Sequence, residues 1–271
     1  MAKKKVLITV KTYPVVSIKY RELVCTAGFL EDGSMIRLYP VPFRKLPYEK
    51  WYQKFDWIEL DIVRNTTDFR PESYRPTNPM EIKIVDSIPA RGHWEARRKI
   101  VLGNVYNNFE VLLTACKDKQ KKTSLAVFKP TQIKDFTFEP TEREWNADQK
   151  AVMQQLNLFE KVKEGQQLIK KLPYIFRYKF TDITGKVREI MIEDWEVGAL
   201  FWKMVKKYKG NEARAIEDVK KKFLDDLARK KDLYFFVGTS LEFQAKNAPN
   251  PFLIIGVFYP PVKNQLELPG V

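Results

Sequence analysis

Cysteine and histidine are scarce in this sequence of 271 residues, which has two cysteines and one histidine. Cys25 and Cys116 lie far apart in the chain, so we expect reduced, packed thiols and no disulfide framework. One histidine with two distant cysteines supplies too few ligands for a structural zinc site. A hydrolytic triad would have to use His93, yet Cys25 falls in an expected buried strand and no nucleophile elbow is present. We therefore expect His93 to be the polar tip of a packed helix.

Clustered glycines and long apolar runs are also missing. The eleven glycines are scattered singly, which excludes a glycine-rich phosphate loop. No segment approaches the roughly 18 apolar residues that a membrane helix needs, and "MAKKKVLITVKTYP" lacks the pattern of a signal peptide. The sequence predicts a cytoplasmic protein with no membrane partner, no metal and no cofactor.

Positive charge is what the sequence has in excess. It contains 48 Lys and Arg against 34 Asp and Glu, a net charge of +14 and a pI near 9.5. Most of this excess lies in the N-terminal half of the chain. Such a balance favours a polyanionic partner, with nucleic acid first among the candidates. A lysine-rich surface that only keeps the protein soluble is the alternative.

The N-terminal part of the chain has the pattern of short strands. "KVLITV", "ELVCTAGFL", "MIRLYPV", "WIELDIVR" and "MEIKIVD" alternate or run apolar, and "EDGS" between the second and third supplies a hairpin turn. In "MIRLYPV", Ile36 and Leu38 should share one face, and Arg37 and Tyr39 the other. A helical patch at residues 92–120 and two more strands follow. We predict a basic strand-rich unit over residues 1–160, with these helices inserted.

The C-terminal part predicts a second unit over residues 161–271. A hairpin, "YIFRYKFT" and "VREIMI", precedes two amphipathic helices, and two apolar strands close the chain. Asp194 is placed to cap the first helix and Gly210 to end it. The order strand, strand, helix, helix, strand, strand indicates an α+β fold with an antiparallel sheet and two packed helices.

Several strings resemble a bacterial protein family of uncharacterised function. They are "FRYKFTDITGKVREIMIEDWEVGALFW", "DLYFFVGT", "NPFLIIGVFYPP" and, near the start, "ELVCTAGFLEDGSMIRLYPVPFR". Such proteins look similar to the dual OB-type nucleic-acid-binding proteins of bacterial defence and mobile-element loci. The resemblance implies that the first unit is a small OB-like β-barrel, and it carries over no catalytic residue.

The best candidate for nucleic-acid binding combines cationic and aromatic side chains of the first unit. Guanidinium groups neutralise phosphates, and aromatic rings stack on unpaired bases. If residues 92–99 are helical, Trp94 and Arg98 face the same way and Arg97 lies about 100° off. Alternatively, Trp94 anchors the helix in the core. The candidate residues are Arg37, Tyr39, Arg44, Lys45, Phe69, Arg70, Tyr74, Arg75, His93, Trp94, Arg97, Arg98 and Lys99.

Carboxylates give weaker signals of metal chemistry. A cluster of Asp182, Glu189, Glu193, Asp194 and Glu196 could hold magnesium, but helix capping explains carboxylates at this position equally simply. A nuclease core would use Asp232 with Glu242, Gln244 and Lys246, where oxygen atoms hold a metal and lysine orients water.

We therefore expect a nucleic-acid-binding accessory protein of a bacterial defence or DNA-modification system, and not an enzyme. A metal-dependent nuclease and an interaction subunit that docks on a protein partner in a larger complex are the alternatives. A barrel that recognises a modified base would use the same aromatic and arginine residues.

Overall fold

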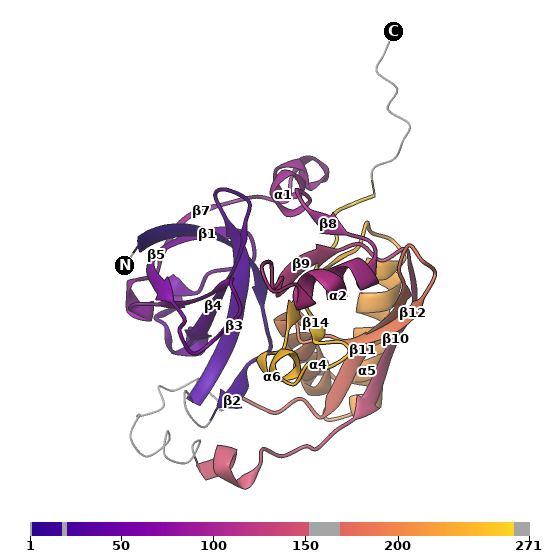
Figure 1. The fold of residues 1–271 in the computed structure, drawn as a ribbon. Helices are drawn as coiled ribbons and strands as arrows, with labels where there is room; N and C mark the ends of the chain where they lie inside the picture. Colours follow the sequence, from indigo (N-terminus) through magenta and orange to yellow (C-terminus); the bar gives the residue numbers. More distant parts are fainter. Residues whose placement is uncertain (1, 18–20, 152–168, 263–271) are drawn as a thin grey trace.

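The structure is a computed structural model of the chain, and it describes residues 2–17, 21–151 and 169–262. Figure 1 shows a β-barrel beside a second unit of sheets and helices. The predicted fold class is confirmed: an α+β chain with a small barrel first and a sheet unit with packed helices second. None of the helices in the described ranges has the length and apolar character needed to cross a membrane.

Five strands of the first unit close into a barrel. They are β1 (Ala2–Lys11), β3 (Arg21–Leu30), β4 (Met35–Val41), β5 (Asp56–Arg64) and β6 (Ser73–Pro76). Their order is β1-β3-β4-β6-β5 and back to β1, and only β4 and β6 run parallel. This is the closed five-stranded arrangement of an OB-like barrel. Two short strands flank it: β2 (Val15–Ser17) beside β3, and β7 (Lys83–Ser87) beside β5.

Alternation of side chains along the strands builds the barrel core. Ile36 and Leu38 of β4 and Ile58 and Ile62 of β5 are buried inside it, as predicted. The turn between β3 and β4 uses Gly33, whose φ of +81° is a conformation that residues with a side chain rarely adopt. Alternate residues of the same strands point away from the barrel interior, and the second unit covers some of them.

The second unit contains two sheets. One is antiparallel, in the order β10 (Gln132–Pro140), β11 (Tyr174–Thr181), β12 (Val187–Met191). The other has the order β14 (Phe252–Phe258), β13 (Tyr234–Thr239), β9 (Leu125–Phe128), β8 (Val105–Tyr106), and only its last pair is parallel. We expected both apolar strands that close the chain to be central; this is confirmed for β13, whereas β14 lies at the end of the sheet.

The helices of the described ranges lie mainly in the second unit. They are α1 (Glu95–Val101), α2 (Phe109–Lys117), α4 (Trp195–Lys207), α5 (Glu212–Lys220), which continues as a π-helix (Lys221–Ala228), and α6 (Leu241–Ala245). Residues 147–151 are also helical. Asp194 caps α4, because its carboxylate accepts a hydrogen bond from the backbone N–H of Glu196 at 3.0 Å. Short 3-10 turns occupy Phe43–Lys45, Tyr48–Lys50, Pro79–Glu81 and Gly92–Trp94.

The predicted boundary between residues 160 and 161 falls in 152–168, outside the described residues. Strands β9 and β10 come before that point, yet they pair with β13 and β11, which come after it, and β8 joins the same sheet through β9. Strand pairing therefore places β8, β9 and β10 in the second unit. By this criterion the barrel ends before β8.

A shared apolar core joins the two units. The Phe29 ring of the barrel lies 6.3 Å from the Phe236 ring of β13, and the Phe55 ring lies 5.8 Å from that of Phe258. Val10 of β1 also belongs to this cluster. The barrel and the second unit therefore bury one continuous surface.

We expect Phe236→Ala to lower the free energy of unfolding by about 3 to 5 kcal/mol, because it empties a fully buried site in the shared core. Phe243→Ala is the matched control, since that ring is 41% exposed and should cost less than about 1 kcal/mol. Urea unfolding followed by fluorescence and circular dichroism measures both. A Phe236→Ala variant in which barrel and second unit unfold in separate transitions, with the barrel as stable as before, would contradict the shared core.

Candidate functional site

A cavity of about 540 Å³ lies between the barrel and the second unit. We call it the interunit cavity. OB-type barrels bind oligonucleotides on their second and third strands and on two loops, which correspond here to β3, β4 and the connections after β1 and β5. All four contribute to the wall. Its lining residues are Thr12, Cys25, Arg37, Tyr39, Asn65, Thr67, Asp68 and Arg70 of the barrel, and Glu193, Gly238, Thr239, Ser240, Leu241, Leu253 and Ile255 of the second unit.

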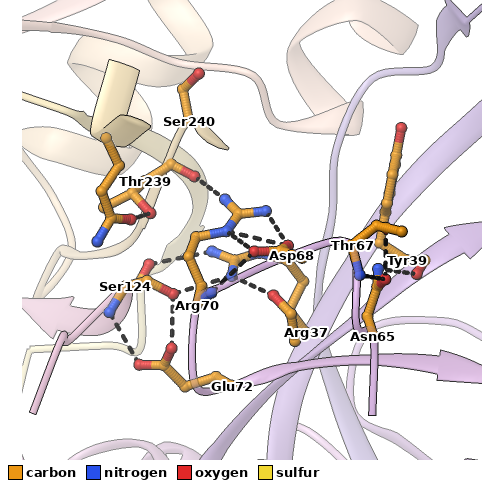
Figure 2. A network of polar contacts seen from close by, with 12 residues as sticks. Arg37, Tyr39, Asn65, Thr67, Asp68, Arg70, Glu72, Ser124, Thr239 and Ser240 are labelled. Carbon is orange, nitrogen blue, oxygen red and sulfur yellow. Dashed lines mark hydrogen bonds and ion pairs between the residues drawn. The ribbon is translucent and has the colours of Figure 1, made fainter. Parts of the chain in front are cut away.

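Arg70 fixes one part of this wall (Figure 2). Its buried guanidinium forms a two-pronged ion pair with Asp68, with Nε at 2.8 Å from Oδ1 and Nη2 at 2.5 Å from Oδ2. Its Nη1 donates to the carbonyl oxygen of Thr239, at the end of β13. The connection between β5 and β6 is therefore tied to the second unit by a charge that is already compensated.

Arg37 fixes the neighbouring part. It is 2% exposed, and its guanidinium donates to the hydroxyls of Ser73 and Ser124 at 3.1 and 3.0 Å and to the carbonyl oxygen of Ser124 at 3.1 Å. The Ser124 hydroxyl in turn donates to Glu72 at 2.7 Å. Arg37 points out of the barrel as predicted, but it was expected on an open surface. That expectation is corrected: the second unit covers this face.

Neutral polar groups line the rest of the barrel wall. The Asn65 amide donates to the carbonyl oxygen of Tyr39 at 3.2 Å, and the Thr67 hydroxyl donates to the Asn65 side chain at 2.9 Å. Opposite them, the Thr239 hydroxyl donates to Gln244 at 2.7 Å. Together with the apolar side chain of Leu241, this set suits a flat, partly polar group such as a nucleobase.

Glu193 brings a carboxyl group to the cavity. Partial burial in the cavity wall raises its pKa to about 7, because fewer water molecules solvate the charged form. Its backbone is held on both sides, with the N–H donating to Ile254 and the carbonyl oxygen accepting from Tyr13, each at 2.8 Å. The Cys25 thiol is free and partly buried, and desolvation raises its pKa.

A second, smaller hollow adjoins the interunit cavity. It measures about 320 Å³ and shares Asn65 and Thr67 with the cavity wall. Exposed Arg75 of β6 lines it, together with Pro40 and Pro42 at the end of β4. The two hollows form one track across the loop that follows β5.

The other candidates of the first unit lie elsewhere. Arg44 and Lys45 occupy a 3-10 turn after β4 and are half-buried. The Tyr74 ring is half-buried with the Arg64 guanidinium 5.5 Å from its centre, and Phe69 is exposed. His93 and Lys99 are exposed near α1. The candidates therefore divide among several places and form no single patch.

Near α1 the predicted geometry is corrected. Trp94 lies before the helix with φ +64°, so it does not share a helical face with Arg98. Arg97 instead stacks on Trp94, with its guanidinium carbon 4.9 Å from the ring centre. Arg98 is buried in an ion pair with Asp232 at 2.8 Å. His93 is exposed on a 3-10 turn, and its expected place on a packed helix is wrong.

The proposed nuclease residues are not brought together. Asp232 precedes β13 and pairs with Arg98 and Lys129. Gln244 follows β13, whose six residues span about 20 Å, and Glu242 of α6 pairs with Lys246, the residue after this helix. Among the described residues, no three His, Cys, Asp or Glu side chains are placed to hold a metal ion.

The carboxylates that the sequence suggested as a magnesium site make separate structural contacts. Asp182 accepts from the Phe109 backbone at 3.2 Å, Glu189 from the Thr137 hydroxyl at 2.6 Å, and Asp194 and Glu196 both contact Lys54. Capping and ion pairing, rather than magnesium, account for these contacts. Glu193 is the member that faces the interunit cavity.

Comparison with known proteins divides the chain as the sheets do. Residues 107–269, more than half of the chain, match the family described as Domain of unknown function (DUF8757). The chain belongs to this family. Residues 2–103, the barrel with α1, match Domain of unknown function (DUF8758). No curated protein matches the chain. The interunit cavity therefore lies between a DUF8757 segment and a DUF8758 segment.

Sequence reasoning missed Asn65, Thr67, Thr239 and Ser240 as residues of the site. The run "RNTTD" directly after β5 was the available signal, because polar residues that follow a barrel strand fall on a rim. The residues after β13 carry no such signal, since their place at the cavity depends on how the units pack.

We expect Glu193→Gln to remove a pH dependence of stability. Because the folded-state pKa is raised, the wild-type protein loses stability as pH rises from about 4.5 to about 7, while the glutamine variant does not titrate. The two should agree near pH 4.5, and at pH 8 the variant should be more stable by about 1 to 3 kcal/mol. Urea unfolding across this range measures the difference. Glu189→Gln is the control, because Glu189 is exposed on β12. Parallel pH profiles for wild type and Glu193→Gln would contradict the raised pKa of Glu193.

Proposed function

We propose that this protein binds nucleic acid and that one unpaired base enters the interunit cavity. The observation that carries the proposal is the position of the cavity, which opens on the strands and loops that OB-type barrels use for oligonucleotides. The net charge of +14 supports it, because a polyanion is attracted to such a chain. The resemblance to proteins of bacterial defence and mobile-element loci favours a role as an accessory component there.

The cavity contributes recognition rather than charge. Arg37 and Arg70 are held by protein oxygen atoms and keep the wall rigid. We expect a base to contact the neutral side chains that line the cavity, such as Asn65 and Thr67. A volume of about 540 Å³ lies within the roughly 300–1,000 Å³ of small-molecule sites, enough for a nucleotide.

Phosphate contacts come from outside the cavity. Exposed Arg75 lies in the adjoining hollow, where a strand whose base enters the cavity would place a neighbouring phosphate. Binding with a base removed from its stack requires a single strand or a displaced nucleotide. We therefore expect single-stranded oligonucleotides to bind more tightly than a duplex of the same sequence.

We expect Leu241→Glu to weaken binding of a single-stranded oligonucleotide by about tenfold, because it places a negative charge on the cavity wall. Val111→Glu is the matched control, since Val111 is also an exposed apolar residue in the first turn of a helix, away from the cavity. Fluorescence anisotropy with labelled single-stranded DNA, RNA and duplex DNA, at about 50 and about 200 mM salt, measures the affinities.

Two results would contradict this function. One is the absence of binding to any of the three nucleic acids at the lower salt concentration. The other is an equal loss in Leu241→Glu and Val111→Glu, which would mean that only total charge matters. Steeply salt-dependent binding that Leu241→Glu alone weakens would support it.

A further inference from the structure

A second cavity, of about 320 Å³, is also walled by both units and shares no lining residue with the interunit cavity. We call it the Arg97 cavity. On β1, Lys11 faces it, while the next residue, Thr12, lines the interunit cavity. The residues that matter for its chemistry are Lys11, Lys54 and Arg97 of the barrel side, and Trp195, Glu196 and Tyr259 of the second unit.

The Arg97 guanidinium is oriented so that it can bind an anion. Its guanidinium carbon contacts two rings, 4.1 Å from the centre of Phe55 and 4.9 Å from that of Trp94. Its Nε donates to the carbonyl oxygen of Ile88 at 2.8 Å, which fixes the orientation. In the described ranges, neither Nη atom has a hydrogen-bond partner and no carboxylate pairs with the group. A stacked guanidinium with a free fork suits a phosphate or carboxylate bound through two parallel hydrogen bonds.

Lys11 supplies a second cation. Its Nζ donates to the carbonyl oxygen of Tyr52 at 3.0 Å and lies 4.4 Å from the Phe43 ring centre and 5.6 Å from that of Trp195. Burial and then repulsion from Lys54 lower the pKa of this amine to about 8.

Three carboxylates act on Lys11, and none of them forms an ion pair with it. Lys54 takes up two of them, with Nζ at 2.8 Å from Asp194 and at 3.3 Å from Glu196. Asp56, the third that acts on Lys11, accepts from the backbone N–H of Gln53 at 2.7 Å. Of the three cationic side chains that line this cavity, Lys11 and Arg97 are the two that form no ion pair among the described residues.

We propose that the Arg97 cavity binds a small aromatic phosphate, of the class of nucleoside monophosphates. The phosphate lies on Arg97 and Lys11, and the ring packs against Trp195. Aromatic walls hold the ring, and a volume of about 320 Å³ limits the ligand to about one nucleotide. This site is independent of the nucleic-acid function, because the two cavities have separate walls.

Calorimetric titration of the full-length protein with AMP, adenosine and inorganic phosphate tests the proposal. AMP should bind more tightly than either of the other two, because each of them supplies one half of the contacts. Arg97→Gln should weaken AMP binding by about tenfold or more, through the loss of a charged two-pronged contact. Arg214→Gln is the matched control, since that guanidinium also stacks on a ring, 4.9 Å from the centre of Tyr208, and does not line the cavity.

A second variant covers the case in which Arg97→Gln disturbs the packing. Gln53 is exposed and lines the cavity, so Gln53→Glu adds a negative charge without removing an apolar contact. It should weaken AMP binding severalfold, whereas Gln120→Glu on an exposed loop should not. For wild type, affinity should also fall as pH rises above about 8, when Lys11 loses its proton.

Three outcomes would overturn the proposal. They are no AMP binding at millimolar concentration, equal affinity for AMP and adenosine, and AMP affinity unchanged in both Arg97→Gln and Gln53→Glu. Because oligonucleotide binding is measured with variants of the other cavity, failure here would leave the nucleic-acid function standing.

Discussion

Two buried guanidinium groups of the barrel are held by oxygen atoms of the other unit, and the site depends on this arrangement. Arg70 binds the carbonyl oxygen of Thr239 while paired to Asp68, and Arg37 binds Ser124, whose hydroxyl is held by Glu72. Breaking one of these contacts would leave a buried charge unsatisfied, which is far more costly than losing a surface ion pair. The outer face of β4 is therefore fixed against the second unit and becomes the wall of a cavity.

This arrangement changes how the barrel is expected to work. In an open OB-type groove, arginines reach the phosphates directly. Here the arginines on the corresponding face give rigidity, and the groups left for a ligand are neutral or, like Glu193, carry a shifted pKa. Charge is left to exposed residues such as Arg75, at some distance from the base. Because Arg37 and Arg70 are buried, we expect the base to be recognised inside the cavity and the phosphates to be bound by cationic residues outside it.

Much of the fold could be predicted because it is encoded locally. Alternation placed Ile36 and Leu38 inside the barrel, the Asp-Gly turn marked the hairpin, and Asp194 marked the start of α4. The site could be predicted only in part. The same alternation assigned Arg37 and Tyr39 to the outer face, yet nothing near them in the sequence shows that β9 and β13 cover this face. Contacts such as Arg98 with Asp232 join residues far apart in the chain, and a local pattern carries no information about them.

The central claim is that the covered face of the barrel is the binding face. Hydrogen–deuterium exchange of the full-length protein, with and without a single-stranded oligonucleotide at low salt, tests it most directly. The account predicts slower exchange on both walls of the interunit cavity, at residues 65–72 and 238–241. Slower exchange confined to the lysine-bearing strands β1 and β7, with residues 65–72 and 238–241 unchanged, would contradict it.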